Sequence, residues 1–65
     1  MNIGDIVCVV GFTSLPESFL GRYGVVIDIN EYKCQIEFYH PVNRLGGLSI
    51  MAVESDLWKI GETDF

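Results

Sequence analysis

Basic residues are scarce in this sequence. Four lysines and arginines stand against nine aspartates and glutamates, which gives a formal net charge of -5 at pH 7. Nucleic-acid binders gain much of their affinity from clustered Lys and Arg that neutralise phosphates. Long apolar runs are also missing, because no stretch approaches the ~18 residues that a membrane-spanning helix needs. We therefore expect neither nucleic acid nor a membrane to be a partner.

Cysteine and histidine are equally rare. The sequence has two cysteines, Cys8 and Cys34, and a single histidine, His40. A structural zinc site needs four ligands, usually in closely spaced pairs, so we expect no metal site. Two cysteines are also too few for the disulfide framework of a small secreted domain. We therefore expect two reduced thiols, one facing inward and one outward, and a cytoplasmic location.

Catalytic signatures are absent as well. His40 precedes Pro41 in a turn-like segment, and no serine lies in a nucleophile-elbow motif. The glycines match neither a phosphate-binding loop nor a dinucleotide fingerprint. A chain of 65 residues also has little room for an enclosed pocket of ~300 Å³. We predict no catalytic residues and no cofactor, and hence a protein that is not an enzyme.

The sequence does contain a series of short segments that are rich in β-branched and aromatic residues and are separated by turn-like segments. The expected strands are residues 3–10, 22–29, 33–39, 48–53 and 58–60. Five short strands bury a core only when their sheet curls or closes. We therefore predict one all-β antiparallel domain with a core at about residues 3–60 and a frayed tail at 61–65.

The longest connection is the loop after the first strand, residues 12–21. Ser14 is expected to cap a single helical turn there, with Pro16 at its start and Glu17 at the capping-box position. A second turn is expected at residues 54–57, because Ser and Asp favour local backbone hydrogen bonds. Residues 40–47, which contain Pro, Asn and Gly-Gly, are expected to form the other substantial loop.

Four segments resemble the sequence pattern of small SH3-like barrels. They are Gly4-Asp5-Ile6-Val7, Gly21-Arg22-Tyr23-Gly24-Val25-Val26, Gln35-Ile36-Glu37-Phe38 and Asp56-Leu57-Trp58-Lys59-Ile60. Their spacing is similar to that in photosystem I reaction-centre subunit IV, the variable chain of ferredoxin–thioredoxin reductase and KOW-type domains. The resemblance implies a five-stranded antiparallel SH3-like barrel. It implies no partner, because the basic residues with which those families bind RNA or acidic ferredoxin are missing here.

Apolar residues outnumber the places that a small core offers. Hydrophobic residues make up 49% of the chain, and a domain of this size buries only ~60% of its unfolded surface. Alternation predicts an inward set, which is Val7, Val9, Val25, Ile27, Cys34, Ile36, Phe38, Leu57 and Ile60, with either Ile50 and Ala52 or Met51 and Val53. The outward set is Ile6, Cys8, Val10 and Val26. A second small core under the long loop would use Phe12, Leu15, Phe19 and Leu20.

The outward apolar residues indicate an interaction surface, because exposed apolar patches mark contact sites and aromatic residues are enriched at interface cores. We predict a non-catalytic protein-interaction module, an accessory or adaptor subunit that binds a protein partner or a second copy of itself. The predicted contact residues are Ile6, Val10, Val26, Tyr23, Tyr39 and Trp58.

An alternative function is that of an acidic inhibitor, encoded by a mobile element or phage, that mimics nucleic acid or blocks a basic site of a host protein. Such an inhibitor needs its carboxylates gathered in one stripe on the surface. The candidates are Glu17, Asp28, Glu31, Glu37, Glu54, Asp56, Glu62 and Asp64. Their scatter over loops, turns and strands favours the interaction module.

Overall fold

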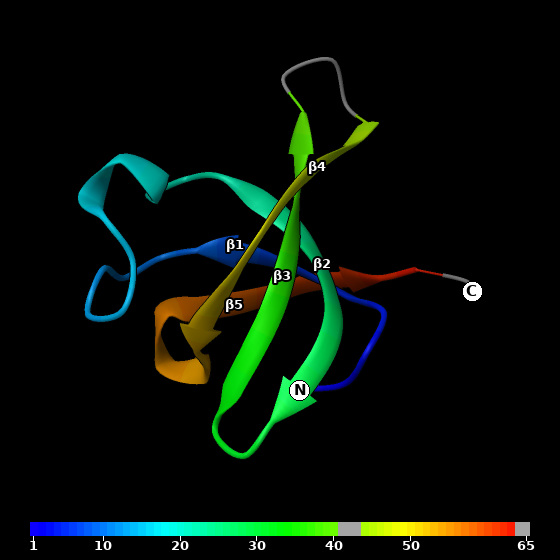
Figure 1. Cartoon of the computed structure of the whole chain (residues 1–65), viewed down its shortest axis with the longest axis horizontal. Helices are drawn as coiled ribbons and strands as arrows, with labels where there is room; N and C mark the ends of the chain where they lie inside the picture. The colour runs from blue at the N-terminus through cyan, green and yellow to red at the C-terminus, as the bar shows by residue number, and fades with distance from the viewer. Residues whose placement is uncertain (41–43, 64–65) are drawn as a thin grey trace.

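The computed structural model describes residues 1–40 and 44–63, with side chains described for 1–39 and 49–63. Its strands are β1 (Asp5–Val9), β2 (Tyr23–Asn30), β3 (Lys33–His40), β4 (Arg44–Val53) and β5 (Leu57–Glu62). They form one antiparallel sheet in the order β4-β3-β2-β1-β5 (Figure 1). Two short 3-10 turns, η1 (Glu17–Phe19) and η2 (Glu54–Asp56), are the only helical segments in the described part of the chain. The predictions of an all-β fold and of five antiparallel strands are confirmed.

Three strands, β3, β4 and β5, are longer than the sequence pattern indicated. β3 and β4 extend into the predicted 40–47 loop, because His40 pairs with Arg44 and Tyr39 pairs with Leu45. The rest of that loop, residues 41–43, lies outside the described residues. β5 continues to Glu62, and the backbone N–H of Thr63 donates to the Gly4 carbonyl at 2.7 Å. Backbone pairing thus orders residues 61–63, whereas the last two residues of the expected tail lie outside the described chain.

A single core cluster receives side chains from all five strands. Its members are Val7, Val9, Leu15, Val26, Cys34, Ile36, Phe38, Ala52 and Leu57. Ala52 on β4 and Leu57 on β5 share this core although their strands are the two edges of the sheet. In a flat sheet four strand spacings would hold such edges ~19 Å apart. The sheet is therefore strongly curved, and Figure 1 shows the β3–β4 hairpin crossing the β1–β5 pair.

Val26 lies inside this core, so its prediction as an outward contact residue is wrong. It pairs with Ile36 on β3 and is fully buried. Residues 25–27 are all apolar, so no polar residue in this run reveals which positions face inward. The strand also bulges between Val26 and Asp28, which leaves Ile27 only half-buried. Strict alternation fails at such a bulge, where one residue is unpaired.

A second bulge explains why Ile60 is exposed rather than buried. Val7 pairs with Lys59 and Ile6 pairs with Gly61, so Ile60 is the extra residue of β5. Its side chain therefore does not point into the core, and its predicted place in the inward set is wrong.

The Asp56 carboxylate fixes the long loop onto the end of the sheet, an arrangement that we call the Asp56 clasp. Oδ1 accepts hydrogen bonds from the backbone N–H and hydroxyl of Thr13 at 3.2 and 2.6 Å. Oδ2 accepts them from the backbone N–H and hydroxyl of Ser14 at 2.8 and 2.6 Å. The Asp56 carbonyl accepts from Val10 and Gly11. Asp56 is almost completely buried, so these bonds replace the water that its charge has lost.

Ser14 therefore serves the clasp and not a helix cap. η1 begins after Pro16 and has no side-chain cap. Besides donating to Asp56, the Ser14 hydroxyl accepts a hydrogen bond from the Val53 backbone N–H at 3.0 Å. One serine thus connects the loop to the end of β4 and to η2.

The clasp brings part of the long loop into the main core. Leu15 is buried in the core cluster, and Phe19 packs on Phe38 with ring centroids 5.2 Å apart. The Arg22 guanidinium lies over both rings, 5.1 and 5.2 Å from their centroids. Phe12 stays exposed, as does Leu20. The expected second core under the loop is therefore an extension of the main core that uses half of the predicted residues.

We expect acid to weaken the clasp. Hydrogen bonds from the Ser14 hydroxyl, and then from the Thr13 hydroxyl, hold the pKa of Asp56 at about 2, below its ordinary value of 3.8. Because the folded pKa is lower than the unfolded one, the carboxylate stabilises the fold fully above about pH 4 and loses that effect as pH falls toward 2. Thermal melts of Asp56→Asn should show a melting temperature several degrees lower at pH 7.

The difference between wild type and Asp56→Asn should shrink between pH 4 and pH 2. Glu17→Gln, a change at an exposed carboxylate, is the control and should follow wild type. A constant gap across this pH range would show that the charge of Asp56 does not hold the loop.

Because Val26 is buried and Val10 is exposed, substitution by lysine should reduce stability strongly at Val26 and only slightly at Val10. Val26→Lys buries an unpaired ammonium and should cost about 3 kcal/mol or more, which is comparable with the whole stability of so small a domain. Val10 is 54% exposed, so Val10→Lys should change the free energy of unfolding by roughly 0.5 kcal/mol or less. Urea denaturation measures both. Equal losses would contradict the assigned strand faces.

Candidate interaction surface

An aromatic row crosses the outer face of the sheet, on the side opposite the core. Cys8 on β1 lies between Trp58 on β5 and Tyr23 on β2 in the strand register. The Tyr39 ring on β3 contacts the Tyr23 ring, with centroids 5.4 Å apart. Trp58 is 66% exposed and Tyr23 is 41% exposed. We call Trp58, Cys8, Tyr23 and Tyr39 the aromatic row.

A second row runs beside it and contains a carboxylate. Gly61, Ile6, Val25 and Glu37 are neighbours across β5, β1, β2 and β3. Val25 is fully buried but lies on this face and outside the core cluster, so its predicted inward orientation is wrong. Ile6 and Glu37 on either side of it are half-buried. Glu37 shares its face of β3 with Tyr39, because side chains two residues apart in a strand point the same way. The outer face is thus largely apolar across β5, β1 and β2, and it becomes polar at Glu37 on β3 and Ser49 on β4.

Four of the predicted contact residues lie together on this face: Ile6, Tyr23, Tyr39 and Trp58. Val10 is exposed but lies one residue beyond β1, where its N–H donates to the Asp56 carbonyl. Val26 is absent from the face, as described above. The predicted contact residues did not include Glu37, although the period of two in a strand places Glu37 and Tyr39 on the same face of β3.

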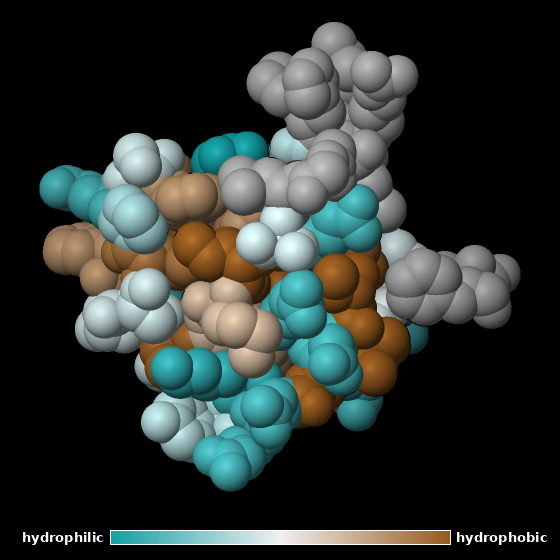
Figure 2. Space-filling model, viewed as in Figure 1, coloured by the Kyte–Doolittle hydropathy of each residue, from teal (hydrophilic) through white to brown (hydrophobic). Residues whose placement is uncertain are grey.

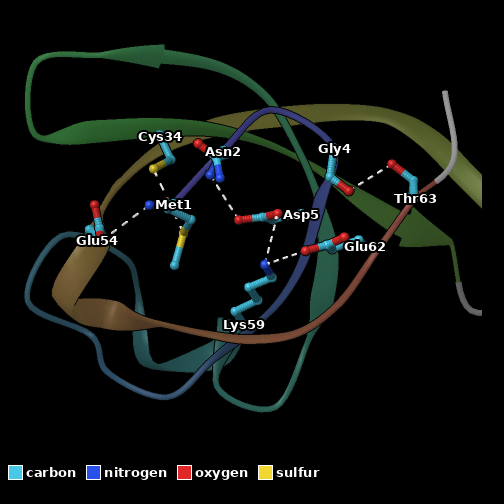
Figure 3. Close-up of polar contacts among 9 residues, drawn as sticks. All are labelled: Met1, Asn2, Gly4, Asp5, Cys34, Glu54, Lys59, Glu62 and Thr63. Carbon is cyan, nitrogen blue, oxygen red and sulfur yellow. Dashed lines mark hydrogen bonds and ion pairs between the residues drawn. The ribbon is translucent and has the colours of Figure 1, made fainter.

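Polar contacts hold β1 and β5 together beneath this surface (Figure 3). The buried Asp5 carboxylate accepts a hydrogen bond from the Asn2 backbone N–H at 2.8 Å and lies 3.5 Å from the Lys59 ammonium. The Thr63 hydroxyl donates to the Gly4 carbonyl at 2.7 Å. These contacts join the two strands that carry Ile6, Cys8 and Trp58, so they position the β1–β5 half of the outer face.

Each cation whose side chain is described already has a neighbour within the protein. Lys59 pairs with Asp5 and with Glu62, which lies 2.7 Å away and raises the pKa of Lys59. Arg22 lies over the Phe19 and Phe38 rings, and Lys33 lies 5.9 Å from the centre of the Tyr32 ring. The carboxylate of Glu37, in contrast, has no hydrogen bond or ion pair with any residue that the structure describes. The surface therefore presents negative charge that the described cations do not neutralise.

The described residues offer neither a metal-binding cluster nor a membrane-spanning helix. Within residues 1–40 and 44–63, no three His, Cys, Asp or Glu side chains lie close enough together to hold a metal ion. In the same residues no helix has the length and apolar character needed to cross a bilayer. Figure 2 shows one side of the molecule, on which apolar and hydrophilic residues interleave. What the described arrangement offers is surface contact through the outer face.

The two cysteines lie on opposite faces of the sheet, as the alternation predicts. Cys34 is buried beside the sulfur of Met1 at 4.0 Å, and burial raises the pKa of its thiol. Cys8 is half-buried in the aromatic row. Titration with a thiol reagent at pH 8 should therefore show one fast group, Cys8, and one slow group, Cys34. Cys8→Ser should remove the fast phase only.

Denatured, unreduced protein should yield two thiols. A count of zero would mean that the two side chains reach each other, and two equally fast native thiols would contradict the burial of Cys34.

Comparison with family models, with curated proteins and with solved structures finds no match to this chain. A functional proposal therefore depends on the geometry of the chain itself. Among the described residues, that geometry includes the aromatic row with Ile6 and Glu37 beside it.

Proposed function

We propose that this protein is a non-catalytic interaction module, an accessory or adaptor subunit that binds a protein through the outer face of its sheet. The observation that carries the proposal is Trp58, which is 66% exposed on a strand held to β1 by backbone hydrogen bonds and by the Lys59–Asp5 ion pair. Trp and Tyr dominate the binding energy of protein interfaces when they lie near the centre of a contact. The aromatic row offers both residue types in one line.

Rigidity makes the aromatic row suitable for binding. Its residues lie on four strands of one hydrogen-bonded sheet, so a partner does not need to order a loop before contact. Tyr23 and Tyr39 already pack ring against ring. Because side-chain and loop ordering oppose association, a surface that is ordered before binding loses less free energy on contact.

We also propose that the curved sheet closes into an SH3-like barrel in a reducing, cytoplasmic setting. The long loop after β1 and the core shared by β4 and β5 support the barrel. The bulges in β2 and β5 support it as well, because bulges bend strands and increase their twist. Unpaired Cys8 and Cys34 are in keeping with a reducing compartment.

The alternative, an acidic inhibitor that mimics nucleic acid or blocks a basic host site, has less support. Asp5 and Asp56 are buried and bonded within the protein, and Glu62 pairs with Lys59. The exposed acids lie on separate elements, with Glu17 in η1 and Glu54 in η2. Asp64 lies outside the described residues. Of the candidates for a continuous stripe, Asp56 is thus withdrawn from the surface and Glu62 is paired with a lysine.

Two aromatic residues of nearly equal exposure provide a matched test. Trp58 is 66% exposed in the aromatic row, and Tyr32 is 65% exposed at the β2–β3 turn. Affinity capture from the native host with the full chain, followed by mass spectrometry, would identify bound proteins. Trp58→Ala should weaken capture about tenfold or more, as loss of an interface anchor does. Tyr32→Ala should leave it unchanged.

Both variants should melt within a few degrees of wild type, because neither side chain is packed in the core. Sedimentation of the purified protein would reveal self-association through the same face. If Trp58→Ala and Tyr32→Ala behave alike in both experiments, the outer face is not the binding surface.

A further inference from the structure

We infer that the partner of the outer face is a cationic protein segment, in which a lysine or arginine lies next to an apolar side chain. This inference rests on the proposed function. The cationic group pairs with Glu37, and its aliphatic stem lies on the Tyr23–Tyr39 ring pair. The adjacent apolar side chain packs on Ile6 and Trp58.

The first support is the placement of Glu37. It is half-buried between Val25 on β2 and Ser49 on β4, and it lies on the same face of β3 as Tyr39. Its carboxylate has no ionic partner among the described residues. Covering this face with an apolar partner would remove water from the carboxylate without compensation, which is costly. A partner with a cation at this point avoids that cost.

The second support is the pair of tyrosine rings beside the carboxylate. The Tyr23 and Tyr39 rings lie 5.4 Å apart at an interplanar angle of 47°. Lys and Arg side chains combine a charged tip with an apolar stem. The stem can cover ring surface while the tip reaches a carboxylate, and a cation over a ring face gains a further attraction. Glu37 beside two tyrosines matches both parts of such a side chain.

The third support is the charge of the whole molecule. The chain carries a net charge of -5, and the described Lys59, Arg22 and Lys33 are engaged within the protein. A field of this sign attracts cationic partners and speeds their encounter. A second copy has the same negative charge, and its described cations are engaged in the same way. Charge complementarity therefore favours a cationic partner over self-association.

The test uses synthetic peptides of equal length that share the same tryptophan and leucine positions. The remaining positions are filled with lysine and arginine in one series, with serine in the second and with glutamate in the third. Binding to the full-length chain is measured by fluorescence anisotropy at ~0.01 M and ~0.15 M ionic strength, between which the Debye length shortens from ~30 to ~8 Å. The cationic series should bind most tightly, and its affinity should fall as salt rises.

Glu37→Gln should weaken binding of the cationic series about threefold to tenfold, reduce its salt dependence and leave the serine series unchanged. Glu17→Gln is the matched control at an exposed carboxylate in η1, and it should behave as wild type. Trp58→Ala should weaken the cationic and serine series alike, because it removes an apolar anchor and no charge.

Several results would overturn the cationic partner. They are equal binding by all three series, no binding by any of them, an equal effect of Glu37→Gln and Glu17→Gln, or a Trp58-dependent dimer in sedimentation. Each of these leaves the proposed function to be judged by the capture comparison of Trp58→Ala with Tyr32→Ala. A different result is that Trp58→Ala does not weaken capture, while the cationic peptides still bind in a salt-dependent way that Glu37→Gln reduces. That result would support the cationic partner and would contradict Trp58 as the anchor of the contact.

Discussion

The fold depends on one buried carboxylate that lies at a junction of three segments. Asp56 accepts hydrogen bonds from the long loop through Thr13 and Ser14, and its carbonyl accepts from the end of β1. Because Asp56 immediately precedes Leu57, the same residue sets where β5 begins and how that strand meets β1. A buried charge of this kind is tolerable only when its oxygens are saturated with donors, so the loop and the sheet edge must form together.

The surface above this junction follows from the same constraint. The clasp holds one end of the β1–β5 pair, and the contacts of Asp5 and Lys59 hold the other. Between these two anchors Trp58 and Cys8 lie side by side on the outer face. A bulge at Ile60 turns that side chain away from the core as well. The exposed apolar groups are therefore presented by a constrained part of the molecule and not by a flexible loop.

Local sequence pattern was sufficient to predict the number and order of the strands, but not all of their ends or faces. In β3, polar residues at alternate positions placed Ile36 inward and Tyr39 outward correctly, which is why the β3 member of the aromatic row was predictable. In β2, three consecutive apolar residues carried no such signal, and Val26 was assigned to the wrong side. The clasp was not predictable, because Asp56 in an acidic turn resembles a solvated charge and its donors lie more than 40 residues earlier in the chain.

Exposed aromatic residues favour association, whereas the negative charge of the chain opposes association with another acidic surface. Together these two properties restrict which surfaces fit the proposed binding face. An uncovered apolar face on a sheet favours association with any similar face. The net charge of -5 opposes that association between copies of this chain. Glu37 adds a local barrier, because an apolar or acidic surface laid over the row would strand its carboxylate without a partner. Under the proposed function, selection among partners then comes from the free-energy cost of wrong contacts as much as from the gain of right ones. A partner surface with both an apolar anchor and a cation avoids the charge repulsion and also pairs the Glu37 carboxylate.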